Sequence, residues 1–139
     1  MKTVFLLITS IILFSGCNND DTNDDCSGIA CNESYVVITV TIKDQDLNPF
    51  SLDDFKVVNL ENGADITTDM TDFEFQLMQQ FGVYPLFGDE YLREFENQEL
   101  EIQFKGILSN QEIIVENYIV STNCCHVFLI SGDNELIIN

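Results

Sequence analysis

Residues 35–42 read Tyr-Val-Val-Ile-Thr-Val-Thr-Ile, so that apolar side chains alternate with hydroxyl-bearing ones over most of the segment. An alternation of period two is typical of a β-strand with one buried face, because successive side chains of a strand point to opposite sides. The face that we expect to be buried carries Val36, Ile38, Val40 and Ile42. Thr39 and Thr41 lie on the other face. The segment therefore predicts a strand that covers a hydrophobic core.

Further short runs of this kind follow along the chain, separated by turn residues. We expect strands near residues 55–60, 73–77, 100–104, 113–120, 127–129 and 136–138. The alternative for residues 77–81 is a helical segment. The runs at 100–104 and 113–120 flank the turn Ser109-Asn110-Gln111, which predicts a hairpin. About seven strands with frequent turns point to an all-β fold, a single antiparallel β-sandwich over residues 26–139.

Two segments between these strands lack a clear alternation. We expect residues 82–88 to be irregular backbone and residues 89–95 to form one or two helical turns, with Asp89 as the N-cap. Aromatic residues are dense here, and most of them are expected in the core because the chain has no Trp. The alternative is that they line an exposed groove for a ligand or partner. They are Phe73, Phe75, Phe81, Tyr84, Phe87, Tyr91 and Phe95.

The first 16 residues have the layout of a secretory signal peptide. Lys2 precedes a largely apolar run, and the small residues Ser15 and Gly16 precede Cys17. The run is too short to span a membrane, which takes roughly 20 apolar residues. Small residues directly before a cysteine resemble the bacterial lipobox, which implies that Cys17 becomes the lipidated first residue of the mature protein. Ordinary cleavage, which would leave Cys17 free, is the alternative.

Residues 17–25 are expected to be the lipidated cysteine and a flexible acidic tether. Residues 18–25 read Asn-Asn-Asp-Asp-Thr-Asn-Asp-Asp and contain no apolar side chain that could pack on a core. An acidic run after a lipidated cysteine also resembles the surface-export signal of Bacteroidota lipoproteins. That resemblance implies an outer-membrane lipoprotein that faces the cell exterior. The alternative is a spacer that carries no address.

The charge of the chain limits its partners. It has 24 acidic and five basic residues and a formal net charge of −19. The basic residues that remain after removal of the signal peptide are Lys43, Lys56, Arg93 and Lys105. Nucleic acids and anionic membrane surfaces are bound by clusters of Lys and Arg, so we expect neither as a partner. The acidity favours solubility and could attract divalent cations or a basic partner.

Four cysteines remain if Cys17 is acylated: Cys26, Cys31, Cys124 and Cys125. An even number in an exported chain predicts disulfides. A bridge between the neighbours Cys124 and Cys125 would be strained, so we expect both of them to bond to Cys26 and Cys31, in either arrangement. The alternative is a thiol- or metal-binding site of Cys124, Cys125 and His126. Adjacent cysteines do not easily face one zinc ion, because structural zinc sites usually separate their paired cysteines by two residues.

Other candidate sites are weaker. Asp44-Gln45-Asp46-Leu47-Asn48 has the spacing of a calcium loop, but Pro49 and Phe55 stand where an EF-hand needs Gly and Glu. A looser calcium site would use Asp44, Asp46, Asp53 and Asp54. The acidic residues Glu94, Glu96, Glu99 and Glu101 offer carboxylate pairs without specificity. His126 is the only histidine, which excludes a multi-histidine metal site within one chain. We therefore expect no enzyme, no cofactor and no catalytic or metal-binding residue.

Residues 38–50 resemble the first strand and turn of transthyretin-like and carboxypeptidase-regulatory-like domains, in which a strand, an Asp, a Gly-containing turn and a Pro follow one another. Leu47 occupies the place of the glycine, so we expect the turn to differ. Tyr84-Pro85, Tyr91-Leu92 and residues 124–127 resemble small Bacteroidota lipoproteins that carry such a sandwich. The resemblance covers residues 26–139 and implies a fold and an address. We therefore expect a non-enzymatic binding or accessory module for another envelope protein or an extracellular ligand.

Overall fold

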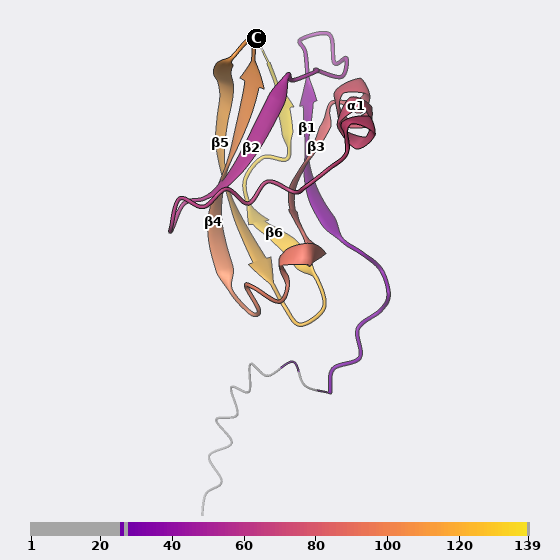
Figure 1. The fold of residues 1–139 in the computed structure, drawn as a ribbon, viewed down its shortest axis with the longest axis vertical. Helices are drawn as coiled ribbons and strands as arrows, with labels where there is room; N and C mark the ends of the chain where they lie inside the picture. Colours follow the sequence, from indigo (N-terminus) through magenta and orange to yellow (C-terminus); the bar gives the residue numbers. More distant parts are fainter. Residues whose placement is uncertain (1–25, 27, 139) are drawn as a thin grey trace, which may run out of the picture.

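Two β-sheets face each other in the computed structural model, which describes residues 26 and 28–138 (Figure 1). The smaller sheet has the order β3-β1-β7 and consists of β1 (Val37–Lys43), β3 (Val83–Gly88) and β7 (Glu135–Ile137). The larger sheet has the order β2-β4-β5-β6 and consists of β2 (Asp54–Asn59), β4 (Glu99–Leu108), β5 (Gln111–Thr122) and β6 (Val127–Ser131). Neighbouring strands are antiparallel except β1 and β7, which are parallel. The expected all-β sandwich of about seven strands is confirmed.

The expected signal peptide at residues 1–16, the lipidated Cys17 and the tether up to residue 25 lie outside the described residues. Within the part of the chain that the structure describes, no helix is both long and apolar enough to cross a membrane.

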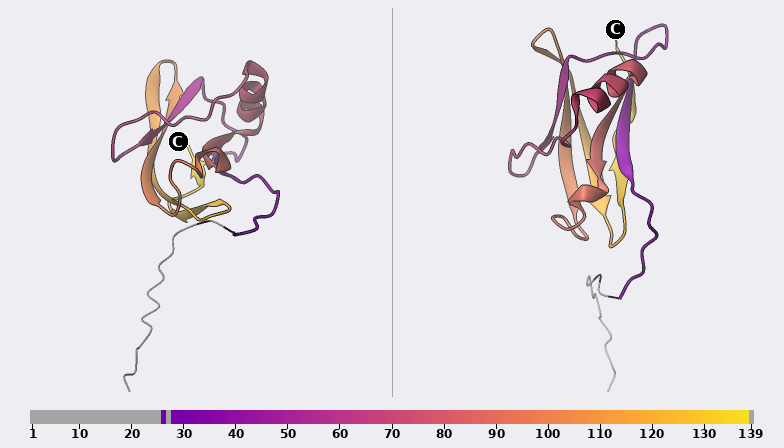
Figure 2. Two further views of the ribbon diagram at one scale, coloured as in Figure 1. Left: turned by 60° about the horizontal axis from the view of Figure 1, so that its bottom comes forward. Right: turned by 45° about the vertical axis from the view of Figure 1, so that its right-hand side comes forward.

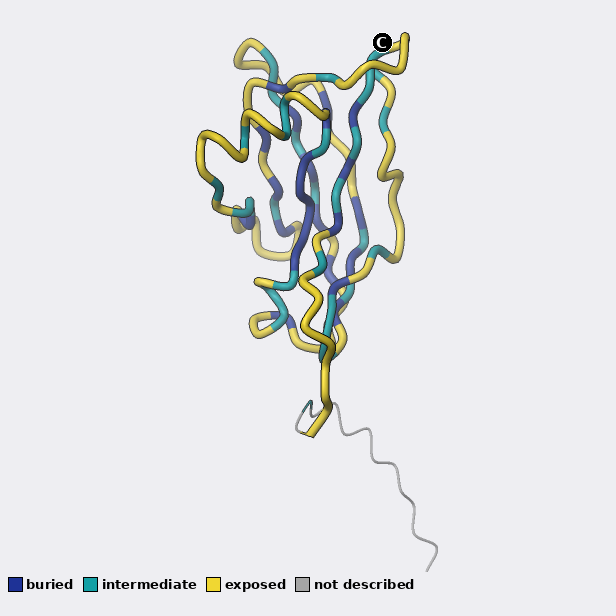
Figure 3. Tube along the Cα trace, turned by 90° about the vertical axis from the view of Figure 1, so that its right-hand side faces the viewer, coloured by how far each residue is buried: buried dark blue, intermediate teal, exposed yellow. Residues whose placement is uncertain are grey.

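Alternating side chains of both sheets build the core, as the stripes of buried residues in Figure 3 show. Val40 and Ile42 of β1 are fully buried, and so are Ile102 and Phe104 of β4. The face of β1 that the sequence predicts to be buried is therefore the core face. Burial of one such side chain contributes about 1.5–3 kcal/mol, which makes this alternation the main determinant of the fold.

The aromatic side chain of Tyr84 connects the two sheets. Its ring lies 5.4 Å from that of Phe55 in β2 and 6.3 Å from that of Phe104 in β4, measured between centroids. The Tyr84 hydroxyl accepts a hydrogen bond from the N–H of Leu52 (2.8 Å) and donates one to the carbonyl of Phe50 (3.2 Å). A buried tyrosine needs such partners, and these fix the chain between β1 and β2.

The strand expected near residues 73–77 is wrong, because this segment belongs to helix α1 (Asp72–Phe81). Thr71 and Glu74 form a reciprocal capping box, in which each side chain accepts a hydrogen bond from the backbone N–H of the other residue. Phe73, Phe75 and Leu77 occupy alternate positions in the sequence, as apolar residues of a strand do. The capping pattern Thr-x-x-Glu indicates a helix and is the better predictor of this segment.

The irregular backbone expected at residues 82–88 is also wrong, since residues Val83–Gly88 form β3. Residues 84–88 are all buried, so the strand shows no alternation of apolar and polar residues. One face of β3 contributes to the core, and α1 lies beside the other (Figure 2). Pro85 is compatible with this strand because β3 is an edge of its sheet.

Asp89 is not the N-cap of a helix. The short 3₁₀-helix η1 (Asp89–Tyr91) begins after Gly88, which makes no side-chain cap. The Asp89 carboxylate instead accepts hydrogen bonds from the backbone N–H groups of Val36 and Val127, both at 2.9 Å. The carboxylate therefore joins three segments that are distant in sequence.

The turn after β1 places Leu47 at φ 65°, in the left-handed region that favours glycine. Asp44 stabilises this turn, since its carboxylate accepts hydrogen bonds from the N–H groups of Asp46 (2.9 Å) and Asn48 (2.8 Å). Leu47 therefore adopts a backbone conformation that is more usual for glycine.

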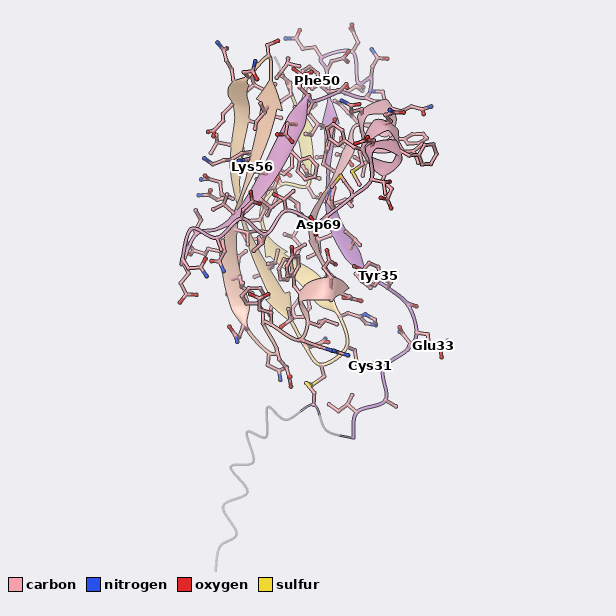
Figure 4. All side chains as sticks on the ribbon, in the orientation of Figure 1. Cys31, Glu33, Tyr35, Phe50, Lys56 and Asp69 are labelled. Carbon is pink, nitrogen blue, oxygen red and sulfur yellow. A yellow bond between two sulfur atoms is a disulfide. The ribbon has the colours of Figure 1, made fainter. Side chains whose placement is uncertain are left out.

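The expected crossing disulfides are confirmed. Cys26 is bonded to Cys124, and Cys31 is bonded to Cys125. Both bridges lie at one end of the sandwich, where the described chain begins, as the position of Cys31 in Figure 4 shows. They tie the start of the domain to the connection between β5 and β6.

Candidate functional site

A hollow of about 600 Å³ lies between α1 and the outer face of the smaller sheet. It arises because α1 is joined to β3 by Gly82 alone and so folds back beside the sheet. On the helix side the lining residues are Glu74, Leu77, Met78 and Phe81. On the sheet side they are Tyr35, Val37, Thr39, Val83 and Pro85. The preceding loop adds Thr68, Asp69 and Met70.

The walls of this hollow expose apolar side chains to solvent. Phe81 is 58% exposed, and Leu77 and Val37 are each 38% exposed. Phe73, Leu77 and Phe81 are spaced by four residues and therefore follow one side of the helix. Phe73, which is 68% exposed, does not line the hollow. A contiguous exposed apolar surface on an otherwise acidic protein is the kind of feature that marks a binding site.

A second hollow of about 440 Å³ adjoins the first and shares Tyr35, Thr68 and Asp69 with it. Its other lining residues are Thr67, Glu90, Tyr91 and Glu94. Figure 4 shows Tyr35 and Asp69 on the same side of the molecule, below α1. The two hollows together thus have an apolar part beside the helix and a part that carries three carboxylates.

Hydrogen bonds connect the residues that lie between the two hollows. The Glu90 carboxylate accepts one from the hydroxyl of Tyr35 and another from the hydroxyl of Thr68 (2.8 Å). Partial desolvation of the hydroxyl group, followed by its hydrogen bond to Glu90 and the charge of Glu90, raises the pKa of Tyr35 to about 12. Burial, followed by the charge of Glu90, also raises the pKa of Tyr91 to about 12. Both phenols therefore remain protonated near neutral pH and act there as neutral hydrogen-bonding groups.

A third hollow of about 440 Å³ lies against the loop 67–72 and is lined mainly by polar residues, together with Phe55 and Phe75. Its polar groups are engaged with each other, since Asp65 accepts hydrogen bonds from the N–H and hydroxyl of Thr67 (3.0 and 2.6 Å). These bonds lower the pKa of Asp65 and stabilise the loop. This hollow offers fewer apolar groups to a ligand than the one beside α1.

The aromatic residues expected near this region divide between the core and the surface. Tyr84, Phe87 and Phe95 are buried, and Phe75 and Tyr91 are partly buried. Phe73 and Phe81 are exposed on α1. The expectation that most of them belong to the core holds, and Phe81 is one that lines an exposed groove.

The predicted cluster of Cys124, Cys125 and His126 lies at the connection between β5 and β6. Cys124 and Cys125 both form disulfides, so neither supplies a free thiol. Within residues 26 and 28–138, one group of three potential metal ligands lies close together: Cys26, Glu96 and Cys124. The two sulfurs of this group are bonded to each other, which removes the thiolates that a metal would need.

His126 lies between β5 and β6 and is hydrogen-bonded on both sides of its ring. Its Nδ1 is 2.9 Å from the carboxylate of Asp89, and its Nε2 is 2.9 Å from the amide oxygen of Asn32. That oxygen also accepts the N–H of Ser34, which fixes the amide orientation. Both ring nitrogens thus face acceptor oxygens. Sequence reasoning missed this link, because Asp89 and Asn32 are separated from His126 by 37 and 94 positions.

The aspartates of the looser calcium site have separate roles. Asp44 caps its own turn, and Asp53 accepts the N–H of Ser109 (2.6 Å) at the hairpin of β4 and β5. Asp54 accepts the N–H of Phe55 (2.9 Å). The structure does not bring Asp44, Asp46, Asp53 and Asp54 together in the described part of the chain. The acidic side chains of Glu94, Glu96, Glu99 and Glu101 are all exposed, and only Glu94 lines a hollow of this site.

Comparisons with known proteins do not add to this description. No family model, no curated protein and no solved structure matches the chain. The function is therefore argued from the site itself.

Proposed function

We propose that this chain is a lipid-anchored, non-enzymatic protein of the outer membrane, facing the cell exterior, which acts as a binding or accessory module of an envelope complex. The observation that carries the proposal is the apolar hollow beside α1, of about 600 Å³. Hollows of this size accept a few side chains of a partner or a small ligand. The partner is another envelope protein or an extracellular ligand.

The position of the disulfides supports an anchored module. The anchor at Cys17 would join the domain at Cys26, and both bridges lie at that end. Helix α1 lies toward the opposite end of the sandwich (Figure 1). A tether attached at the end that carries the two disulfides would leave the hollow directed away from the lipid.

The residue types that could take part in catalysis are engaged in structural contacts, which supports a non-enzymatic role. The single histidine is bonded to Asp89 and Asn32, and the four cysteines of the domain are in disulfides. These residue types usually supply the nucleophile or the base of a hydrolase, and here they hold the fold. The alternative function as a thiol- or metal-binding protein would require free thiols at Cys124 and Cys125, and gains no support from these bonds.

Affinity capture from gently solubilised membranes tests the proposal, with two matched variants on the same helix. Phe81→Ser removes an apolar side chain from the hollow, whereas Phe73→Ser removes an even more exposed phenylalanine outside it. We expect a partner that is recovered with the wild type and with Phe73→Ser and is lost with Phe81→Ser. Recovery of the same molecules with all three proteins, or of none with the wild type, would contradict the proposal.

A further inference from the structure

We infer that the occupant of the two joined hollows is a segment of a partner protein in which apolar side chains stand next to Lys or Arg. The apolar residues lie beside α1, and the cationic group lies among Asp69, Glu90 and Glu94. This inference rests on the proposed function and specifies the chemistry of the partner.

The hollow beside α1 determines the apolar half of the ligand. Leu77, Met78 and Phe81 face Val37, Val83 and Pro85 across it. Six apolar side chains that form one concave surface recognise aliphatic or aromatic groups, because such groups release water from both surfaces on contact. This role explains why Leu77 and Phe81 are exposed on a helix that has no fully buried residue.

The adjoining hollow would bind the Lys or Arg side chain of the partner segment. Asp69, Glu90 and Glu94 all line this hollow. None of the residues that line either hollow is basic. Within the described residues, Lys43 pairs with Glu135, Lys105 pairs with Glu112, and the ring of His126 lies against Asp89. None of these pairs neutralises the three carboxylates. A Lys or Arg of a partner would find uncompensated negative charge there.

The tyrosine rings add a second attraction for a cation. Tyr35 is 64% exposed and lines both hollows. Tyr91 also lines the acidic hollow, and its ring is stacked on Phe87 at a centroid distance of 5.0 Å, which fixes its orientation. A guanidinium or ammonium group within about 6 Å of an aromatic face is attracted by the ring as well as by nearby carboxylates.

Charge also decides against other occupants. A second copy of the chain would bring a molecule of formal charge −19 against an acidic rim. Nucleic acids and anionic lipid headgroups would be repelled for the same reason. A basic and apolar peptide segment is the class that matches both halves.

Binding of three labelled peptides to the lipidated protein, held in neutral detergent micelles, tests the inference by fluorescence anisotropy. The first peptide combines a Leu-rich half with a Lys-rich half. The second carries Glu in place of Lys, and the third carries Ser in place of Leu. We expect the first to bind at least tenfold more tightly than either of the others, with an affinity that falls when salt is raised from about 0.05 M to about 0.5 M.

Variants locate the binding. Phe81→Ser and the double variant Asp69→Asn/Glu94→Gln should each weaken binding of the Lys/Leu peptide at least fivefold, and the double variant should also reduce the salt dependence. The matched controls Phe73→Ser and Glu116→Gln should leave binding unchanged, because neither residue lines a hollow. Equal binding of the Glu/Leu peptide, or equal loss in the control variants, would overturn the inference.

The two proposals fail in different ways. If Phe81→Ser abolishes capture of a partner from membranes but the Lys/Leu peptide binds no better than the Glu/Leu peptide, the hollow is a binding site and the cationic class is wrong. If Phe81→Ser affects neither experiment, the hollow is not the site, and both proposals are overturned.

Discussion

Asp89 shows how one side chain secures the end of the sandwich at which the described chain begins. Its carboxylate is 8% exposed and accepts hydrogen bonds from Val36, Val127 and His126. Burial alone would raise the pKa of Asp89, but the hydrogen bonds from His126 and the two N–H groups outweigh burial and lower it below its usual value of 3.8. The charged form is therefore the one that the fold stabilises.

We predict that Asp89→Asn lowers the free energy of unfolding by about 2 kcal/mol near neutral pH, since an amide leaves at least one of these donors without its acceptor. A folded-state pKa below 3.8 means that this contribution is complete above that pH and is lost as the pH falls through the folded-state pKa. Urea unfolding of both proteins near pH 7 and near pH 3 measures it. A difference between the proteins that stays the same at both pH values would contradict this role for Asp89.

Gly82 determines how closely α1 and β3 approach β1. It has φ 63°, and an added Cβ would lie 2.5 Å from the carbonyl oxygen of Ile42 and 2.9 Å from the backbone nitrogen of Phe50. Gly63 has φ 73° with nothing within 4 Å of an added Cβ. Alanine substitutions at the two glycines therefore distinguish the free-energy cost of a side chain at positive φ from the cost of a steric clash.

We predict that Gly63→Ala costs about 1 kcal/mol, the usual penalty for a side chain at positive φ. Gly82→Ala should cost at least about 3 kcal/mol, because the backbone of β1 must also move. Thermal or urea unfolding of the two variants gives the comparison. Equal losses would show that the close approach at Gly82 is unimportant.

At the scale of elements, the two disulfides act as a pair. Each closes a loop of more than 90 residues, with sequence separations of 98 and 94. Once one bridge is formed, the other closes only the short ring between Cys26 and Cys31. In the chain-entropy model the long loop contributes about 5 kcal/mol and the short ring about 2 kcal/mol.

Removal of one bridge as a Cys-to-Ser pair should therefore cost only about 2 kcal/mol, whichever bridge is chosen, and removal of both should cost about 7 kcal/mol. Unfolding by urea of the two single-bridge proteins and of the protein without bridges measures these values. A loss for the protein without bridges that merely equals the sum of the two single losses would contradict the prediction.

Elements with one face in the core were predictable from the sequence, and those that build the site were not. β1 and the hairpin of β4 and β5 alternate because one side faces the core and the other faces solvent. β3 lies between the core and α1, so both of its faces are covered and the alternation disappears. α1 exposes Phe73 and Leu77 and packs Phe75 against the core, so these three apolar residues alternate in the sequence as those of a strand do. The hollow forms between these two elements, which is why its lining could not be derived from the sequence.

At the scale of the whole molecule, the proposed function depends on the lipid anchor and on export of the protein to the outer face of the membrane. We predict that Cys17→Ser releases the protein from the membrane and that protease added to whole cells degrades the wild type. Replacement of Asp20, Asp21, Asp24 and Asp25 by alanine should leave lipidation intact and protect the protein from that protease. Fractionation and whole-cell proteolysis measure both effects. If whole cells protect the wild type as well as the alanine variant, the acidic run is a spacer only.

The most direct test of a binding module with its site beside α1 is photo-crosslinking in intact cells. A photo-reactive phenylalanine analogue replaces Phe81 or Leu77 in the hollow, or Phe73 on the same helix outside it. We predict a discrete cross-linked partner from positions 81 and 77 and none from position 73. Adducts of equal yield at all three positions, or none at positions 81 and 77, would contradict the proposal that the hollow binds a partner.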